Sequence, residues 1–119
     1  MNPVVALDSE HLKTLVAQCI LGNGPTCDLN HIDVSGIHDF AGLFKESPFN
    51  GDISRWDTSS ATTMASMFMQ SKFNGDIAQW NVSKVTAFDD MFHKSRFNKD
   101  ISRWDVSSAK SMTRMFAVT

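Results

Sequence analysis

The sequence predicts an α/β solenoid, in which four strand-plus-helix units of 24 residues are stacked behind an amino-terminal capping helix. Three nearly identical segments begin at Phe49, Phe73 and Phe97 and follow one another without a gap. Each has a short stretch of alternating apolar and polar residues, followed by a stretch with apolar residues at helical spacing. A repeat of this length is typical of solenoids, whose units bury their apolar faces against one another.

The first 24 residues do not share the repeat, and we expect residues 1–24 to form a helix that caps the first unit. Asp8-Ser9 is a helix start signal, and Gly22 is a stop signal. Between them, one apolar face consists of Leu12, Leu15, Val16, Cys19 and Ile20. Such a helix would cover the apolar end of the first unit.

The rest of the chain, 25–119, divides into four units, which are 25–48, 49–72, 73–96 and 97–119. The first unit is degenerate but stays in register. Asp28 falls at the position of Asp52, and Leu43-Phe44 at that of Met67-Phe68.

Each unit divides into a predicted strand and a predicted helix. In "FNGDISRW", a strand near Asp52 to Arg55 would direct Ile53 inward and its polar neighbours outward. In "SKVTAFDDMF", either Ser83 or Thr86 would supply the N-cap of a helix. The apolar residues at helical spacing in that stretch are Val85, Phe88, Met91 and Phe92.

Large apolar residues recur at the same positions of the units, so we expect them to form columns in one continuous core. The columns comprise Ile53, Ile77 and Ile101, then Trp56, Trp80 and Trp104, then Met67, Met91 and Met115, and finally Phe68, Phe92 and Phe116.

Composition excludes several classes of function. The net charge of −2 and the scattered Lys and Arg residues argue against nucleic-acid binding. The longest apolar run, near Leu15 to Leu21, is too short to span a bilayer. The amino terminus shows no secretory signal, so we expect none. The two cysteines, Cys19 and Cys27, are either free thiols or one disulfide, and they cannot make a zinc site alone.

An aspartate column, formed by Asp28, Asp52, Asp76 and Asp100, has two interpretations. Each carboxylate either accepts a hydrogen bond within its own turn or shares a cation such as Ca²⁺ with its neighbours. The asparagine column, Asn50, Asn74 and Asn98, is expected to satisfy backbone groups between elements.

The sequence indicates no enzyme. The four histidines, His11, His31, His38 and His93, lack metal-ligand spacing, and no serine lies in a G-x-S-x-G motif. We therefore expect no catalytic residues, no metal and no cofactor.

Variable positions on the predicted strand face are the candidate protein-binding residues, because concave repeat faces are where solenoids bind partners. They are His31, Ser54, Arg55, Gln79, Ser102 and Arg103.

The units, written F-N-x-D-I-S-x-W-D-V-S-x-V-T-x-M-x-x-M-F, resemble the repeat of BspA-like leucine-rich repeat proteins, which occur as bacterial surface proteins and mycoplasma-type lipoproteins. The lead-in "GPTCDLNHIDVSGIHDFAGLF" is also similar to the start of such arrays. The resemblance covers nearly all of residues 25–119. It implies a leucine-rich-repeat-type solenoid that binds other proteins at the cell surface or after secretion.

We therefore expect a non-catalytic protein-interaction module of bacterial type, adhesin-like or effector-like. The alternative is a small intracellular inhibitor of a bacterial defence or regulatory enzyme, encoded by a phage or plasmid; the missing export signal leaves the cytoplasm open. A further interpretation is a structural fragment of a longer array. It predicts self-association through the uncapped carboxyl end at Met115-Phe116-Ala117-Val118-Thr119.

Overall fold

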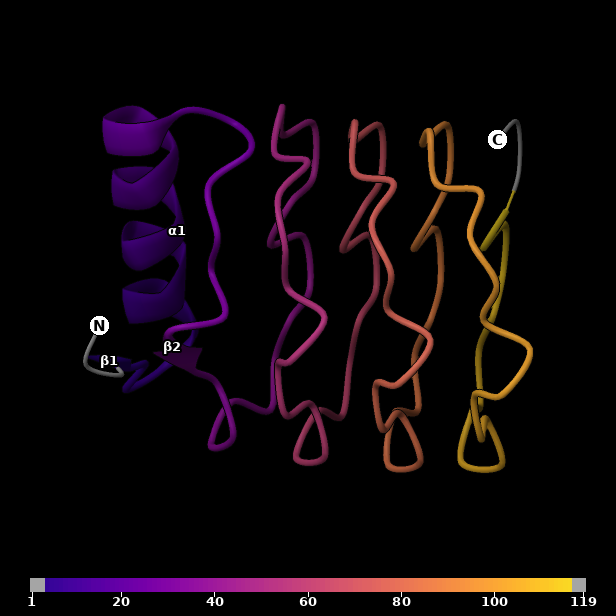
Figure 1. Ribbon diagram of the computed structural model, residues 1–119. Helices are drawn as coiled ribbons and strands as arrows, with labels where there is room; N and C mark the ends of the chain where they lie inside the picture. The colour runs from indigo at the N-terminus through magenta and orange to yellow at the C-terminus, as the bar shows by residue number, and fades with distance from the viewer. Residues whose placement is uncertain (1–3, 117–119) are drawn as a thin grey trace.

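The computed structural model describes residues 4–116. Its regular elements are, in chain order, strand β1 (Val4–Val5), helix α1 (Ser9–Asn23) and strand β2 (Ile32–Asp33). Helix α1 stands at one end, and the rest of the chain leads away from it in successive turns (Figure 1). Predictions for residues 1–3 and 117–119, at the outer ends of the capping segment and the last unit, lie outside the described residues.

Helix α1 is bounded by two capping residues. The Oδ1 atom of Asp8 accepts a hydrogen bond from the backbone N–H of His11 at 2.8 Å, which satisfies a donor of the first turn. At the other end, Gly24 has φ 84°, and its N–H donates to the carbonyl of Ile20 at 2.7 Å. The sequence predicted the stop at Gly22, whereas Gly22 lies inside the helix.

Strands β1 and β2 form a two-stranded parallel sheet that the sequence did not predict. Val4 pairs with Ile32 and Val5 with Asp33, and the N–H of Val4 donates to the carbonyl of His31 at 2.9 Å. Parallel strands need a crossover between them, and α1 supplies it. The sheet therefore brings the start of the chain against the segment that follows the helix.

The predicted fold class is wrong. An α/β solenoid of leucine-rich-repeat type would have a strand and a helix in each of four units. Between residues 34 and 116, however, the structure has no helix and no strand longer than an isolated bridge. The Cα radius of gyration is 13.1 Å, and about 13–14 Å is expected of a compact domain of this length. The molecule is a compact domain with little regular secondary structure.

The helix predicted within residues 83–92 is a series of turns. Asp90 and Lys94 have φ values of 58° and 56°, in the left-handed region that a right-handed helix excludes. The N–H of Phe88 donates to the carbonyl of Ser111, and that of Asp90 to Thr113, both at 2.9 Å. Bonds to the following segment thus replace the bonds to residue i−4 that a helix requires.

The predicted strand near Asp52 and the predicted helix N-cap at Ser83 are both replaced by turns. Asp52 makes only an isolated bridge to Asp28, and the chain then turns at residues 54–55. The hydroxyl of Ser83 donates to the side chain of Asn81 at 2.7 Å, so it stabilises a turn and caps no helix. Small polar side chains that favour helix N-caps favour turns equally.

Residues 24 positions apart nevertheless lie side by side. Parallel bridges join Asp39 to Thr63, Thr63 to Ala87, and Ala87 to Ser111, and Figure 1 shows the successive segments next to one another. Backbone N–H groups in this part of each segment donate to carbonyls of the neighbouring segments, as Phe40 does to Thr63 and Thr86 does to Thr62.

The predicted core columns are confirmed except at the carboxyl end, where Ile101 is half-buried and Phe116 is 48% exposed. The rings of Phe68 and Phe92 have centroids 5.6 Å apart with an interplanar angle of 2°, and those of Trp56 and Trp80 are 6.3 Å apart. These side chains are buried, and they belong to one cluster that also contains Leu12 of α1. Hydrophobic burial thus holds together a chain that has few regular hydrogen-bond ladders. The boundary between 1–24 and 25–119 stays a prediction.

Candidate functional site

Four turns, each opened by an aspartate, carry the side chains that the sequence marked for binding. They are residues 28–31, 52–55, 76–79 and 100–103, and together we name them the turn row. Buried tryptophans connect neighbouring turns through hydrogen bonds from their indole N–H groups to backbone carbonyls. These bonds run from Trp56 to Leu29 at 2.9 Å, from Trp80 to Ile53 at 3.0 Å and from Trp104 to Ile77 at 3.0 Å.

The aspartate column has a structural role. In each turn the carboxylate Oδ1 accepts the backbone N–H of the residue two positions later. The donors are Asn30 at 2.9 Å, Ser54 at 2.9 Å, Ala78 at 3.0 Å and Ser102 at 2.8 Å. The hydrogen-bond interpretation is confirmed. Across residues 4–116, no three His, Cys, Asp or Glu side chains are grouped to hold a metal ion.

The asparagine column is also confirmed as structural. The Oδ1 atom of Asn50 accepts the backbone N–H of Asn74 at 2.9 Å, and that of Asn74 accepts the N–H of Asn98 at 2.8 Å. Asn30 has a related part inside the turn row, because its Oδ1 accepts the N–H of Arg55 at 2.9 Å. Side-chain amides therefore fix the spacing between neighbouring segments.

The turn hydrogen bonds also fix the charge of these carboxylates. Hydrogen bonds from Asn30 and then from Ser54 hold the pKa of Asp52 below its usual value of 3.8. Bonds from Ser102 lower the pKa of Asp100 in the same way. Both carboxylates are ionised near neutral pH, but one oxygen of each is already engaged within its turn.

The structure places the predicted site residues on turns and not on the strand face that the sequence predicted. Arg55, Gln79 and Arg103 occupy the last position of three consecutive turns, and all three are exposed. Ser102 is exposed beside Arg103, whereas Ser54 is half-buried because its hydroxyl donates to Asp52 at 2.7 Å. The row therefore offers long polar side chains from neighbouring segments.

The two arginines of the row form no ion pair among residues 4–116, although the charge of each helps to lower the pKa of the aspartate in its own turn. The ion pairs between residues 4 and 116 are Lys13–Glu10 and Arg114–Asp90, and neither involves Arg55 or Arg103. Their guanidinium groups are therefore available to an outside acceptor, and such groups bind carboxylates in a bidentate manner.

His31, at the first turn, differs from the other predicted residues because it is half-buried and lines a cavity. This cavity, of about 530 Å³, lies between α1 and the first turn. Its other lining residues are Val4, Leu15, Gln18, Cys19, Asn23, Cys27 and Asp28. Sequence reasoning missed this site, because its walls come from β1, α1 and the turn, and no local pattern connects them.

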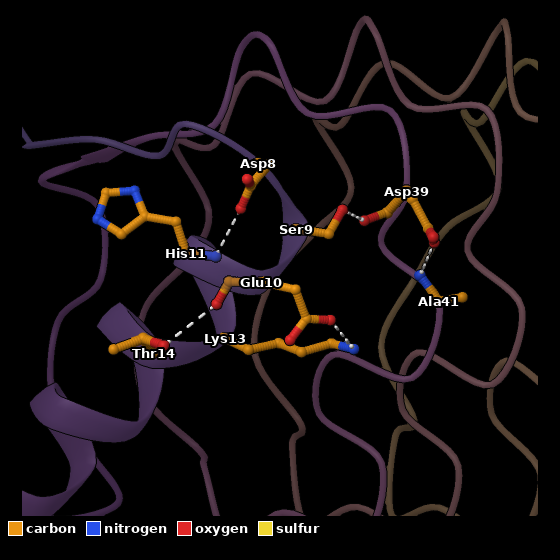
Figure 2. Close-up of polar contacts among 8 residues, drawn as sticks. All are labelled: Asp8, Ser9, Glu10, His11, Lys13, Thr14, Asp39 and Ala41. Atoms are coloured by element: carbon orange, nitrogen blue, oxygen red, sulfur yellow. Dashed lines mark hydrogen bonds and ion pairs between the residues drawn. The ribbon is translucent and has the colours of Figure 1, made fainter.

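A second contact fastens the start of α1 to the same segment. The hydroxyl of Ser9 donates to the carbonyl of Asp39 at 2.6 Å, while the Asp39 carboxylate accepts the N–H of Ala41 at 2.8 Å (Figure 2). A smaller cavity of about 210 Å³ lies here and is lined by residues 7–9 and 36–39. Both cavities therefore border α1.

Comparison with protein families gives one match. Residues 11–119 match the family described as "Mycoplasma protein of unknown function, DUF285". The chain belongs to this family. The match spans α1 after its first residues and the whole turn row of the DUF285 chain. No curated protein and no solved structure matches it. In the described part of the DUF285 chain, no helix has the length and apolar character needed to cross a membrane.

Proposed function

We propose that the chain is a non-catalytic protein-binding module of bacterial type, and that the turn row contacts its partner. The observation that carries the proposal is the juxtaposition of Arg55, Gln79 and Arg103 on consecutive turns. All three are exposed, and buried Trp indoles hold their turns to neighbouring segments. A surface that is rigid before binding loses less conformational entropy on association.

The chemistry of the row favours a partner surface that carries carboxylates. Arg55 and Arg103 present guanidinium groups that form no ion pair with residues 4–116, at either side of Gln79, whose amide can donate and accept. Arginine is enriched at protein interfaces and at their energetic hot spots. The aspartates of the row compete less with a partner's carboxylates for these guanidinium groups than their number suggests. Each aspartate already accepts a hydrogen bond inside its turn.

The resemblance of the repeat to that of BspA-like proteins supports the same class of function. The resemblance implies binding to proteins, and an adhesin-like or effector-like binder fits it. The leucine-rich-repeat solenoid that it also implied is not part of the proposal.

A matched pair of variants tests the proposal. The first, Arg55→Ala with Arg103→Ala, removes two positive charges from the turn row. The control, Lys72→Ala with Arg96→Ala, removes two exposed positive charges at 24-residue spacing outside the row. Each protein is immobilised and exposed to lysate of the source organism and of its host, and bound proteins are identified by mass spectrometry.

We expect one partner to be retained by the wild type and the control but to bind the row variant at least about tenfold more weakly, as loss of a hot-spot arginine implies. Circular dichroism and tryptophan fluorescence establish that both variants fold. If both variants retain every partner equally, the turn row is not the binding surface.

Self-association through the carboxyl end stays a separate prediction. Met115 is buried and Phe116 is exposed, while residues 117–119 lie outside the described part of the chain. Light scattering over a range of concentrations tests it, because self-association raises the apparent mass with concentration.

A further inference from the structure

Helix α1 and the segment after it bring two thiols to one cavity. Cys19 lies on α1 one turn before its end, and Cys27 lies three residues after Gly24. Both line the cavity of about 530 Å³ beside the first turn of the row. The Cys19 thiol donates to the backbone carbonyl of Asp28 at 3.9 Å, and Asp28 directly follows Cys27 in the chain. The two thiols therefore face one cavity at the contact between α1 and the first segment.

We propose that Cys19 and Cys27 are a modification site at which a low-molecular-weight disulfide, such as oxidised glutathione, closes a bond that fastens α1 to the first turn. The proposal is independent of the turn row as a binding surface, since the bond lies on α1 and its connection.

The two cysteines have different parts in the reaction. Cys19 is half-exposed at the cavity, so an external disulfide can reach its sulfur, whereas Cys27 is buried. Burial, and then the neighbouring Cys19 thiol, raise the pKa of the Cys27 thiol to about 12. Thiolate is the attacking species, so Cys19 reacts first and Cys27 follows.

The reaction balances in two exchange steps. The Cys19 thiolate attacks one sulfur of oxidised glutathione, its S–S bond breaks, and one glutathione thiolate leaves. The Cys27 thiol then loses its proton to solvent, and its thiolate attacks the Cys19 sulfur of the mixed disulfide. The second glutathione thiolate leaves and takes up a proton. Overall, two protein thiols are oxidised, and one glutathione disulfide is reduced to two thiols.

Burial, the largest cause of the raised Cys27 pKa, persists after Cys19 has reacted and makes the second step slow near neutral pH. Below that pKa, the thiolate fraction of Cys27 grows roughly tenfold for each pH unit. The Cys19 mixed disulfide should therefore accumulate near pH 7 and close into the protein disulfide much faster near pH 9.

Intact-mass spectrometry of the full chain, treated with oxidised glutathione and quenched with acid, tests this order. We expect a glutathione adduct that disappears with time in favour of a species lighter than the reduced chain by two hydrogen atoms. Closure should be roughly a hundredfold faster near pH 9 than near pH 7. Cys27→Ser should retain the adduct at either pH, and Cys19→Ser should react far more slowly than the wild type.

Some outcomes would overturn the proposal. An adduct that never closes even near pH 9 would show that the thiols do not meet. Disulfide-linked dimers would show that they meet only between molecules. Hydrogen exchange gives a second readout, since closure should slow exchange at the amides of residues 16–23 in α1 while leaving residues 100–116 unchanged. Equal exchange before and after closure would show that the bond does not fasten the helix.

Discussion

The two ends of the molecule contain similar apolar side chains but bury them to different extents. At one end, α1 lies against the first segment, and Phe40 and Phe44 are buried beside Leu12 and Val16. At the other end, Met112 is 43% exposed and Phe116 is 48% exposed. The residue 24 positions before Phe116 is Phe92, which is 0% exposed. Residue type alone therefore does not decide burial in this column, because Phe92 has a ring on both sides and Phe116 stacks only on Phe92 among the described residues.

The largest expected effect is a difference in unfolding free energy between alanine variants of two phenylalanines in one column. Phe92→Ala should lower the free energy of unfolding by about 3–5 kcal/mol, because it leaves a cavity between Phe68 and Phe116. Phe116→Ala should cost about 1 kcal/mol, since half of that ring is exposed to water. Urea unfolding followed by tryptophan fluorescence measures both. Equal costs would show that the described end is covered in solution.

A second prediction compares two glycines at equivalent positions. A Cβ atom on Gly51 would lie 1.9 Å from the backbone carbonyl oxygen of Cys27, whereas on Gly75 it would lie 2.7 Å from the Phe73 ring and 3.4 Å from the nearest backbone oxygen. Gly51→Ala should therefore cost on the order of 2–3 kcal/mol, and Gly75→Ala about 1 kcal/mol. The same urea titration ranks them. A reversed order would mean that the contact near α1 is looser than the structure shows.

The N-cap of α1 provides a smaller effect. Asp8→Ala removes the acceptor of the His11 N–H and should cost about 1 kcal/mol. Asp105→Ala, which removes a turn acceptor from the Ser107 N–H in the last segment, is the matched control and should cost less. Thermal unfolding by circular dichroism compares the two. A larger loss for the control would show that the last segment is the more tightly held end.

The smallest effect is a dependence on acid. Asp52 and Asp57 have pKa values lowered below 3.8 by hydrogen bonds, chiefly from Asn30 and from Ser59. The unfolded chain therefore binds protons at a higher pH than the folded chain. Stability is at its full value above about pH 4 and falls as the pH drops through the folded pKa values.

Asp52→Asn should flatten part of this loss, because it removes one of the carboxylates whose pKa is lowered in the folded chain. Unfolding free energies of the wild type and the variant, measured at several pH values between neutral and strongly acidic, test this prediction. A wild-type curve that does not fall in acid would contradict the turn hydrogen bonds.

Side-chain spacing predicted the core better than it predicted the backbone. Trp56 and Trp80 were expected to face a shared interior, and they do. Val85, Phe88, Met91 and Phe92 were read as a helix, but turns with left-handed residues place the same four side chains inside. Inward-facing spacing is compatible with more than one backbone path, so periodicity alone does not distinguish them.

The candidate binding residues stay a prediction, and only their placement can be compared with the structure. The positions of Arg55, Gln79 and Arg103 on one row followed from the repeat register, although they lie on turns. The cavity at His31 was not predictable, because Val4, Cys19 and Asp28 meet there only after α1 folds back. Strand β1 was missed because its two residues gain a partner only through that crossover.

The sequence by itself determined which residues are equivalent, which columns supply the core, and that the asparagines satisfy backbone groups, while it left a shared cation open beside hydrogen bonding for the aspartates. These properties follow from residue chemistry repeated at a constant interval. Only the tertiary structure decided that the backbone follows turns and that α1 encloses a cavity with two thiols. The physical reason is that N–H groups of each segment bond to carbonyls of the neighbouring segments, and such long-range bonds override local helix and strand preferences.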